Sequence, residues 1–144
     1  MKLVLAVLCC TLLSSCNDPV GTWCGWYRDA LYNSRPDWKF AAYFRFDDDG
    51  RAVVAMTGSQ AADPKLAAMY QEWGFWYENS EGYTFETQNP KYPKFDYLQR
   101  GIWLMDGDEA EFTVWNRLFP SFSKGKAMGT AERCDVDMPD APGP

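Results

Sequence analysis

Short runs of alternating apolar and polar residues recur along this chain, and polar turns that end in glycine separate them. The first two runs, Lys39–Phe46 and Arg51–Thr57, flank the turn Asp48-Asp49-Gly50. This pattern predicts a β-hairpin with a three-residue loop, in which Gly50 adopts the left-handed conformation. The loop sets the pairs Phe46–Ala52, Phe44–Val54 and Ala42–Met56. All of these even-numbered side chains then share one face.

A second hairpin is expected between Gly74–Tyr77 and Tyr83–Thr87, across the turn Ser80-Glu81-Gly82. The same three-residue loop gathers four aromatic side chains on one face. They are Phe75, Tyr77, Tyr83 and Phe85.

A third hairpin is expected between Tyr97–Leu104 and Ala110–Leu118, through a turn near Asp106-Gly107. An even register places six apolar side chains on one face. They are Leu98, Ile102, Leu104, Phe112, Val114 and Leu118.

The remaining segments predict one helix and two outer strands. Asp63 and Pro64 have the character of a helix N-cap and first helical residue. Four apolar residues follow at helical spacing before Gly74: Leu66, Met69, Tyr70 and Trp73. Val20–Arg28 and Lys126–Asp135 supply an opening and a closing strand. Residues 136–144 contain three prolines and two aspartates and are expected to form a disordered tail.

These elements predict a mainly β fold, an up-and-down antiparallel barrel of about eight strands with one short helix. Closure of the barrel removes the exposed edges that an open sheet would present. The first and last strands of such a barrel are antiparallel neighbours, so we expect Cys24 to lie opposite Cys134. Trp23 and Arg133 then lie diagonally across the same seam, on the other face, within reach of a cation–π contact.

The first residues have the architecture of a removable signal. Lys2 is followed by an apolar run of about ten residues, which is too short to span a bilayer. The run ends in Leu13-Ser14-Ser15-Cys16, which resembles the lipobox of bacterial lipoprotein signal peptides. The resemblance implies cleavage before Cys16, lipidation of its thiol and attachment to a bilayer. A buried strand or helix, or a secretory signal without lipid, is the alternative.

This interpretation divides the chain into a signal peptide (residues 1–15), a lipidated tether (16–19) and a barrel domain (20–135). Asparagine at position 17 resembles lipoproteins that are passed on to the outer membrane. We therefore expect a lipid-anchored protein of the bacterial envelope that faces the periplasm.

The cysteines then have few possible roles. Cys9 and Cys10 leave with the signal and Cys16 carries lipid, so Cys24 and Cys134 remain. Two cysteines in an oxidising compartment are expected to form a disulfide. A zinc site is the competing use, but the chain contains no histidine, so we expect no metal.

The charge of the chain excludes some partners. The formal net charge is −6, and it becomes −7 once Lys2 is removed with the signal. This balance argues against nucleic acid and anionic lipid headgroups as partners. Seven tryptophans, eight tyrosines and nine phenylalanines all follow Cys16, so the domain is rich in large, stiff side chains. Such residues fill cores, line apolar pockets or stack on sugars.

Gly21-Thr22-Trp23 on the first strand, together with Arg133 on the closing strand, resembles the lipocalin and wider calycin pattern. In that pattern a late arginine covers the tryptophan of a G-x-W motif at the closed end of the barrel. The resemblance implies an eight-stranded cup that holds an apolar ligand or presents its rim to a protein. The expected helix between the third and fourth strands departs from simple lipocalin topology.

We expect no enzymatic activity and no cofactor. The chain has no histidine, no G-x-S-x-G motif and no glycine-rich phosphate loop, and its cysteines are otherwise occupied. Two acidic clusters remain, Asp47-Asp48-Asp49 and the group formed by Asp106, Asp108 and Glu109. Both lie at expected hairpin tips, where turn geometry favours aspartate, and neither has the spacing of a calcium loop.

Two binding functions are consistent with the sequence. In the first, the barrel binds a small apolar or aromatic ligand, although a filled barrel without a cavity is equally allowed. The expected pocket consists of Trp23, Phe44, Val54, Met56, Tyr83, Phe85 and Phe112. In the second, the chain is an interaction lipoprotein, such as an inhibitor of, or immunity protein against, an envelope-acting enzyme. Its contacts would be aromatic residues of the connecting segments Asp29–Trp38 and Asn89–Phe95. They are Tyr32, Trp38, Tyr92 and Phe95.

Overall fold

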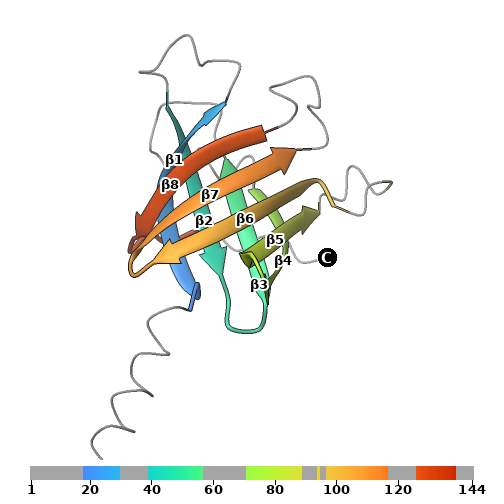
Figure 1. Ribbon diagram of the computed structural model, residues 1–144, viewed down its shortest axis with the longest axis horizontal. Helices are drawn as coiled ribbons and strands as arrows, with labels where there is room; N and C mark the ends of the chain where they lie inside the picture. Colours follow the sequence, from blue (N-terminus) through green and yellow to red (C-terminus); the bar gives the residue numbers. More distant parts are fainter. Residues whose placement is uncertain are drawn as a thin grey trace, which may run out of the picture.

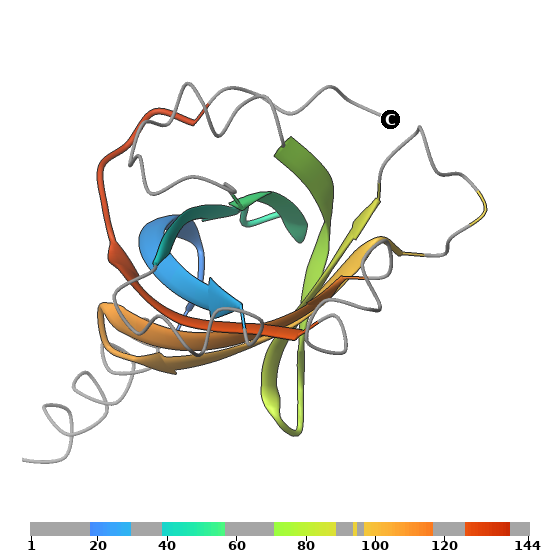
Figure 2. The same cartoon turned by 90° about the horizontal axis from the view of Figure 1, so that it is seen from above.

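The chain folds into a closed antiparallel β-barrel of eight strands, as the computed structural model shows (Figure 1). The structure describes residues 18–29, 39–56, 71–88, 94, 97–116 and 126–138. The strands are β1 (Gly21–Asp29), β2 (Phe40–Phe46), β3 (Arg51–Met56), β4 (Gln71–Asn79), β5 (Gly82–Gln88), β6 (Gln99–Asp106), β7 (Glu109–Asn116) and β8 (Lys126–Arg133). Each strand pairs with the next, and β8 pairs with β1, which closes the ring seen in Figure 2. The predicted mainly β, up-and-down barrel is therefore confirmed.

The three short hairpin turns lie at one end of the barrel, which we call the turn end. The first residue of β1 and the last residue of β8 lie there too, because neighbouring strands alternate in direction. The opposite end, where β1 and β7 finish, is called the far end. The connections at the far end lie outside the described residues, except for Lys39, Lys94, Tyr97 and Leu98.

The expected helix can be compared with the structure only at its last residues. Its residues 63–70, including Leu66, Met69 and Tyr70, lie outside the described residues. The prediction that Trp73 belongs to this helix is wrong, because Trp73 lies in strand β4, where it pairs with Val53 and Gln88. The strand begins at Gln71, before the expected Gly74. In the part of the chain that the structure describes, no helix has the length and apolar character needed to cross a membrane.

The first hairpin has the predicted register. Phe46 pairs with Ala52 and Phe44 with Val54, across the three-residue loop that ends in Gly50. Gly50 has a φ of +84°, the left-handed conformation that glycine adopts without steric cost. The amide of Gly50 donates a hydrogen bond of 3.1 Å to the carbonyl of Asp47, which closes the turn.

The predicted register of the second hairpin is wrong by one residue. Asn79 pairs with Gly82, so the loop contains two residues instead of three. Trp76 therefore shares the inner face with Phe85, whereas Phe75 and Tyr77 point outward and are 51% and 40% exposed. Strand β4 carries three aromatic residues in a row, and such a run does not reveal which face is buried.

The third hairpin differs from its prediction in the same way. Asp106 pairs with Glu109, again across a two-residue loop, and Trp103 pairs with Phe112. Ile102 and Leu104 therefore lie on the outer face of β6 and do not accompany Phe112, and Leu104 is 49% exposed. Leu98 is buried and precedes β6, and Leu118 lies outside the described residues. The inner face of β6 takes the indole of Trp103, which is larger than the side chains of Ile102 and Leu104 and buries more apolar surface.

The seam between β1 and β8 joins the two ends of the barrel sequence. The predicted disulfide between Cys24 and Cys134 is present, with a Cα–Cα distance of 5.8 Å. The predicted register is wrong by two residues, because Cys24 lies opposite Glu132. The bond is therefore diagonal, and the amide of Cys134 donates a hydrogen bond of 3.0 Å to the carbonyl of Thr22.

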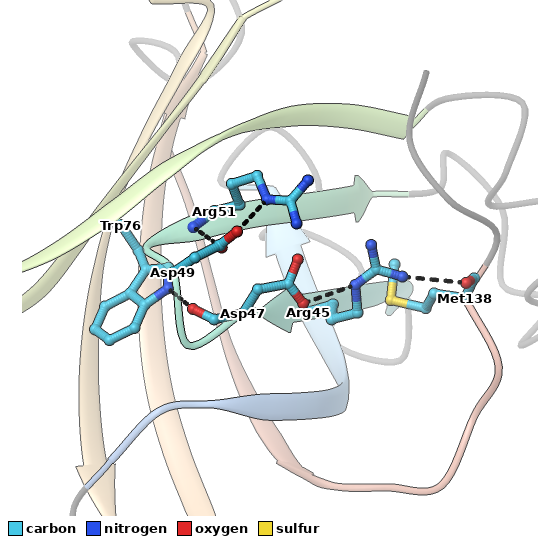
Figure 3. Close-up of polar contacts among 6 residues, drawn as sticks. All are labelled: Arg45, Asp47, Asp49, Arg51, Trp76 and Met138. Carbon is cyan, nitrogen blue, oxygen red and sulfur yellow. Dashed lines mark hydrogen bonds and ion pairs between the residues drawn. The ribbon is translucent and has the colours of Figure 1, made fainter. Parts of the chain in front are cut away.

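After β8 the chain packs against the outside of the barrel. Met138 is 5% exposed and contacts the outward side chains of Tyr43 and Val53. Its carbonyl accepts a hydrogen bond of 3.3 Å from Nη1 of Arg45 (Figure 3). The packed chain thus extends beyond the expected boundary at residue 135, into the first residues of the expected disordered tail. Residues 139–144 of that tail lie outside the described residues.

Candidate functional site

All seven residues of the expected ligand pocket lie in a single cluster inside the barrel. Five are buried: Trp23, Phe44, Val54, Phe85 and Phe112. Met56 and Tyr83 are partly buried and pack against the cluster. The ring of Phe44 lies 4.8 Å from those of Trp103 and Phe112, measured between centroids. These rings contact one another and form a packed cluster in the turn-end part of the interior.

Two glycines let the aromatic rings lie directly on the barrel wall. A Cβ atom at Gly101 would lie 2.1 Å from Cζ of Phe85, and one at Gly129 would lie 2.5 Å from Cζ of Phe112. A larger residue at either position would force a ring to move. The rings of Phe85 and Phe112 therefore pack directly against the backbone of β6 and β8.

Arg133 closes the turn end of the barrel. Its guanidinium carbon lies 4.4 Å from the centroid of the Trp23 ring, which confirms the predicted cation–π contact. The two residues are directly opposite each other, not diagonal as expected. Arg133 also donates hydrogen bonds to the carbonyls of Asp18 (2.5 Å) and Val20 (2.7 Å). Its Nε lies 2.9 Å from Oδ1 of Asp108, so four contacts of three kinds hold one side chain.

The inner face near the far end contains buried polar groups. Glu72 is 9% exposed, and its Oε2 accepts a hydrogen bond of 2.7 Å from the hydroxyl of Thr87. Burial raises the pKa of the Glu72 carboxyl to about 7, and the hydrogen bond from Thr87 opposes this shift. The hydroxyl of Thr87 accepts a hydrogen bond of 3.2 Å from the amide of Gln99. Oε1 of Gln99 is buried and has no hydrogen-bond partner.

A groove of about 840 Å³ lies on the outer face of the barrel, over strands β2, β1, β8, β7 and β6. Its described lining consists mainly of two rows of outward side chains that run across these strands. The first row is Ala41, Trp26, Thr130, Glu111 and Leu104, in which each residue pairs with the next. Trp26 and Leu104 are 40% and 49% exposed, so this row offers two apolar contacts.

The second row lies two residues nearer the turn end on each strand. It is Tyr43, Cys24, Glu132, Glu109 and Asp106, again in consecutive pairs. Three carboxylates are therefore direct cross-strand neighbours, and like charges in such positions repel one another. Among the described residues, none of these carboxylates nor that of Glu111 forms an ion pair, so their charges stay uncompensated.

The first acidic cluster, Asp47-Asp48-Asp49, lies at the β2–β3 turn, as its sequence predicts. Asp49 accepts a hydrogen bond of 2.7 Å from Nε of Arg51, and Asp47 lies 3.3 Å from Nε of Arg45 (Figure 3). The carbonyl of Asp47 also accepts a hydrogen bond of 2.8 Å from the indole nitrogen of Trp76.

The second acidic cluster is divided by the fold. Asp108 binds Arg133, whereas Asp106 and Glu109 line the groove. Within the described ranges, no group of three or more acidic, cysteine or histidine side chains has an arrangement that could hold a metal ion. The groove carboxylates thus form a charged surface.

The four aromatic residues expected to bind a protein partner, Tyr32, Trp38, Tyr92 and Phe95, lie outside the described residues. Sequence reasoning missed Trp26, Leu104, Glu111 and Glu132, which line the groove. The alternation Glu109-Ala110-Glu111-Phe112 indicates that the outer face of β7 is acidic. The alternation does not show which residues of the neighbouring strands join that face, because this depends on the register.

Comparison of the chain with protein-family models, with curated proteins and with solved structures found no match.

Proposed function

We propose that this protein is a lipid-anchored, non-catalytic lipoprotein of the bacterial envelope that binds another protein through its outer groove. The observation that carries the proposal is the contrast between the two faces of the sheet. The inner face at the turn end carries buried rings in mutual contact, and the outer face has an open groove with Trp26 and Leu104 exposed. Exposed tryptophan and leucine beside a groove are typical of a binding surface.

The lipid anchor is supported by the resemblance of Leu13-Ser14-Ser15-Cys16 to a lipobox. Cys16 precedes Asp18 by two residues, and Asp18 lies at the turn end, under Arg133. A lipidated Cys16 would therefore hold the turn end towards the membrane. Incorporation of labelled palmitate into the wild-type protein, and its loss in Cys16→Ala, would support this assignment. An equally labelled Cys16→Ala variant would contradict it.

Docking is tested by photo-cross-linking in the bacterium that produces the protein. A photoreactive phenylalanine derivative replaces Leu104 in the groove, and in a control it replaces Phe75, an exposed residue of similar character on β4. We expect an adduct with one envelope protein from position 104 only. The partner, identified by mass spectrometry, should also bind the purified full-length chain, and Leu104→Ala should weaken that binding. Identical adducts from both positions would contradict the proposal.

A small apolar or aromatic ligand inside the barrel is the second candidate. The resemblance of Gly21-Thr22-Trp23 and Arg133 to the lipocalin pattern favours it. The buried, unpartnered Oε1 of Gln99 also favours it, since a hydrogen-bond donor on a ligand could satisfy this atom. Native mass spectrometry of the full-length protein should then reveal a bound molecule, and repeated detection of the empty chain would exclude it.

A further inference from the structure

We propose that the outer groove receives a basic segment of an envelope protein, in which lysine or arginine side chains alternate with apolar ones. This inference rests on the proposed docking function and specifies the chemistry of the partner. Three properties of the groove support it: its row of carboxylates, its two exposed apolar residues, and the distance between these two apolar residues.

The row of carboxylates supplies the charge complementarity. Glu132 pairs with Glu109, and Glu109 pairs with Asp106, so three negative charges follow one another across β8, β7 and β6. Glu111 adds a fourth carboxylate in the neighbouring row. No lysine or arginine is among the described residues that line the groove. Cationic side chains of a partner would remove the repulsion within the row, which destabilises the free barrel.

The exposed apolar residues define the length of the segment. In the first row, Thr130 on β8 and Glu111 on β7 lie between Trp26 on β1 and Leu104 on β6. Three strand spacings separate β1 from β6, which corresponds to about 14 Å. An extended chain covers this distance with about four residues. A segment lying across the strands would place apolar side chains on Trp26 and Leu104, and basic ones over the carboxylates.

Other occupants fit the groove less well. Anionic lipid headgroups would be repelled by the four carboxylates. A second copy of the chain carries a formal net charge of −6 and offers no general complementarity to an acidic surface. The described carboxylates also lack an arrangement that could hold a metal ion. A basic protein segment satisfies both the charged and the apolar parts of the lining.

The test uses the full-length protein in non-ionic detergent and three fluorescently labelled nine-residue peptides. One peptide alternates lysine with leucine, one alternates glutamate with leucine, and one alternates lysine with serine. Fluorescence anisotropy gives their dissociation constants. We expect the first peptide to bind tightest, the lysine–serine peptide to bind more weakly and the glutamate–leucine peptide not to bind.

Matched variants locate the binding on the groove. The double variant Glu109→Gln/Glu132→Gln should weaken binding of the lysine–leucine peptide by about tenfold. The control Glu78→Gln/Glu81→Gln changes the net charge equally on exposed residues outside the groove lining, and should change binding less than about twofold. Leu104→Ala should also weaken binding, whereas Phe75→Ala should not.

Thermal unfolding separates a binding role from a structural one. The Glu109→Gln/Glu132→Gln variant should unfold at a higher temperature than the wild type, because it removes like charges from neighbouring strands. Equal loss of peptide binding in the groove variant and its control would overturn the inference, as would unchanged binding in the groove variant. Competition by spermidine as effective as that by the peptide would indicate a small polyamine instead and would also overturn it.

This outcome is separable from that of the docking proposal. If a partner cross-links at position 104 but the glutamate variants bind it unchanged, the groove docks a protein without a basic segment. If the lysine–leucine peptide binds the groove but no envelope protein cross-links there, the docking function itself fails.

Discussion

The turn end and the far end of the barrel interior are built from different kinds of residue. At the turn end, Trp23, Phe44 and Trp103 are fully buried and contact one another, with Arg133 stacked over Trp23. Towards the far end, a carboxyl, a hydroxyl and an amide follow one another through Glu72, Thr87 and Gln99. Burial of apolar surface stabilises the first region at every pH, whereas the second includes a buried acid whose ionisation opposes folding.

This difference indicates that the turn end is the main source of stability. The turn end also carries the disulfide, the three short turns and Asp18, whose carbonyl accepts a hydrogen bond from Arg133. The groove lies on the outer side of the same half of the barrel, so its two rows are supported from behind by packed rings. A rigid support of this kind favours binding, because less side-chain and backbone freedom is lost on association.

The largest effect is expected for the rings of the turn end. Phe44→Ala should reduce the free energy of unfolding by about 4 kcal/mol, because it removes a fully buried ring that contacts four others. Chemical denaturation of the disulfide-bonded protein measures this change. Phe75→Ala, at an exposed position, serves as the control. A loss below about 1 kcal/mol for Phe44→Ala would show that this half of the barrel is not tightly packed.

The next effect concerns the far end and depends on pH. The pKa of Glu72 is raised to about 7 in the folded protein, so the folded state holds its proton more tightly than the unfolded state. The contribution of Glu72 to the free energy of unfolding should therefore be most favourable below about pH 4.5 and fall by about 3 kcal/mol as the pH rises from there through 7. Denaturation across this pH range measures it.

Glu72→Gln should abolish the pH-dependent contribution of position 72 to the free energy of unfolding, because glutamine stays neutral and has a similar shape. The variant should then be more stable than the wild type above pH 7 and show a flatter profile. Glu78→Gln, an exposed position on the same strand, is the control and should keep the wild-type pH profile. Parallel pH profiles of the wild type and Glu72→Gln would refute the expected difference between the two ends.

A smaller effect is expected where Arg133 closes the turn end. Arg133→Lys keeps the positive charge but cannot contact Trp23, two carbonyls and Asp108 at once. We expect a loss of about 2 kcal/mol in the free energy of unfolding. Arg51→Lys, whose arginine pairs with exposed Asp49, should change it by less than about 0.5 kcal/mol. Equal losses would show that Arg133 acts as an ordinary surface charge.

The smallest effect on stability is expected on the outer face. Leu104→Ala and Phe75→Ala remove exposed side chains, so each should change the free energy of unfolding by at most about 0.5 kcal/mol. The same denaturation measurement checks this. A large loss for Leu104→Ala alone would indicate that the groove residue stabilises the barrel and would weaken its assignment to binding.

The sequence by itself determined the strand count, the up-and-down order, the first hairpin and the disulfide. Asp48-Asp49-Gly50 specifies one loop length, and alternation in the flanking runs agrees with it, so the register was predictable. The cysteine pair followed from the small number of cysteines, which does not depend on register.

Only the tertiary structure decided the faces of β4 and β6, and with them the groove. The runs Phe75-Trp76-Tyr77 and Ile102-Trp103-Leu104 are apolar at every position, so their period does not identify the buried face, and a shift of one residue exchanges the two faces. Packing of Trp76 and Trp103 inside the barrel resolved this choice and left Leu104 outside. The groove combines side chains from five strands, so its residues became neighbours only once every register was fixed.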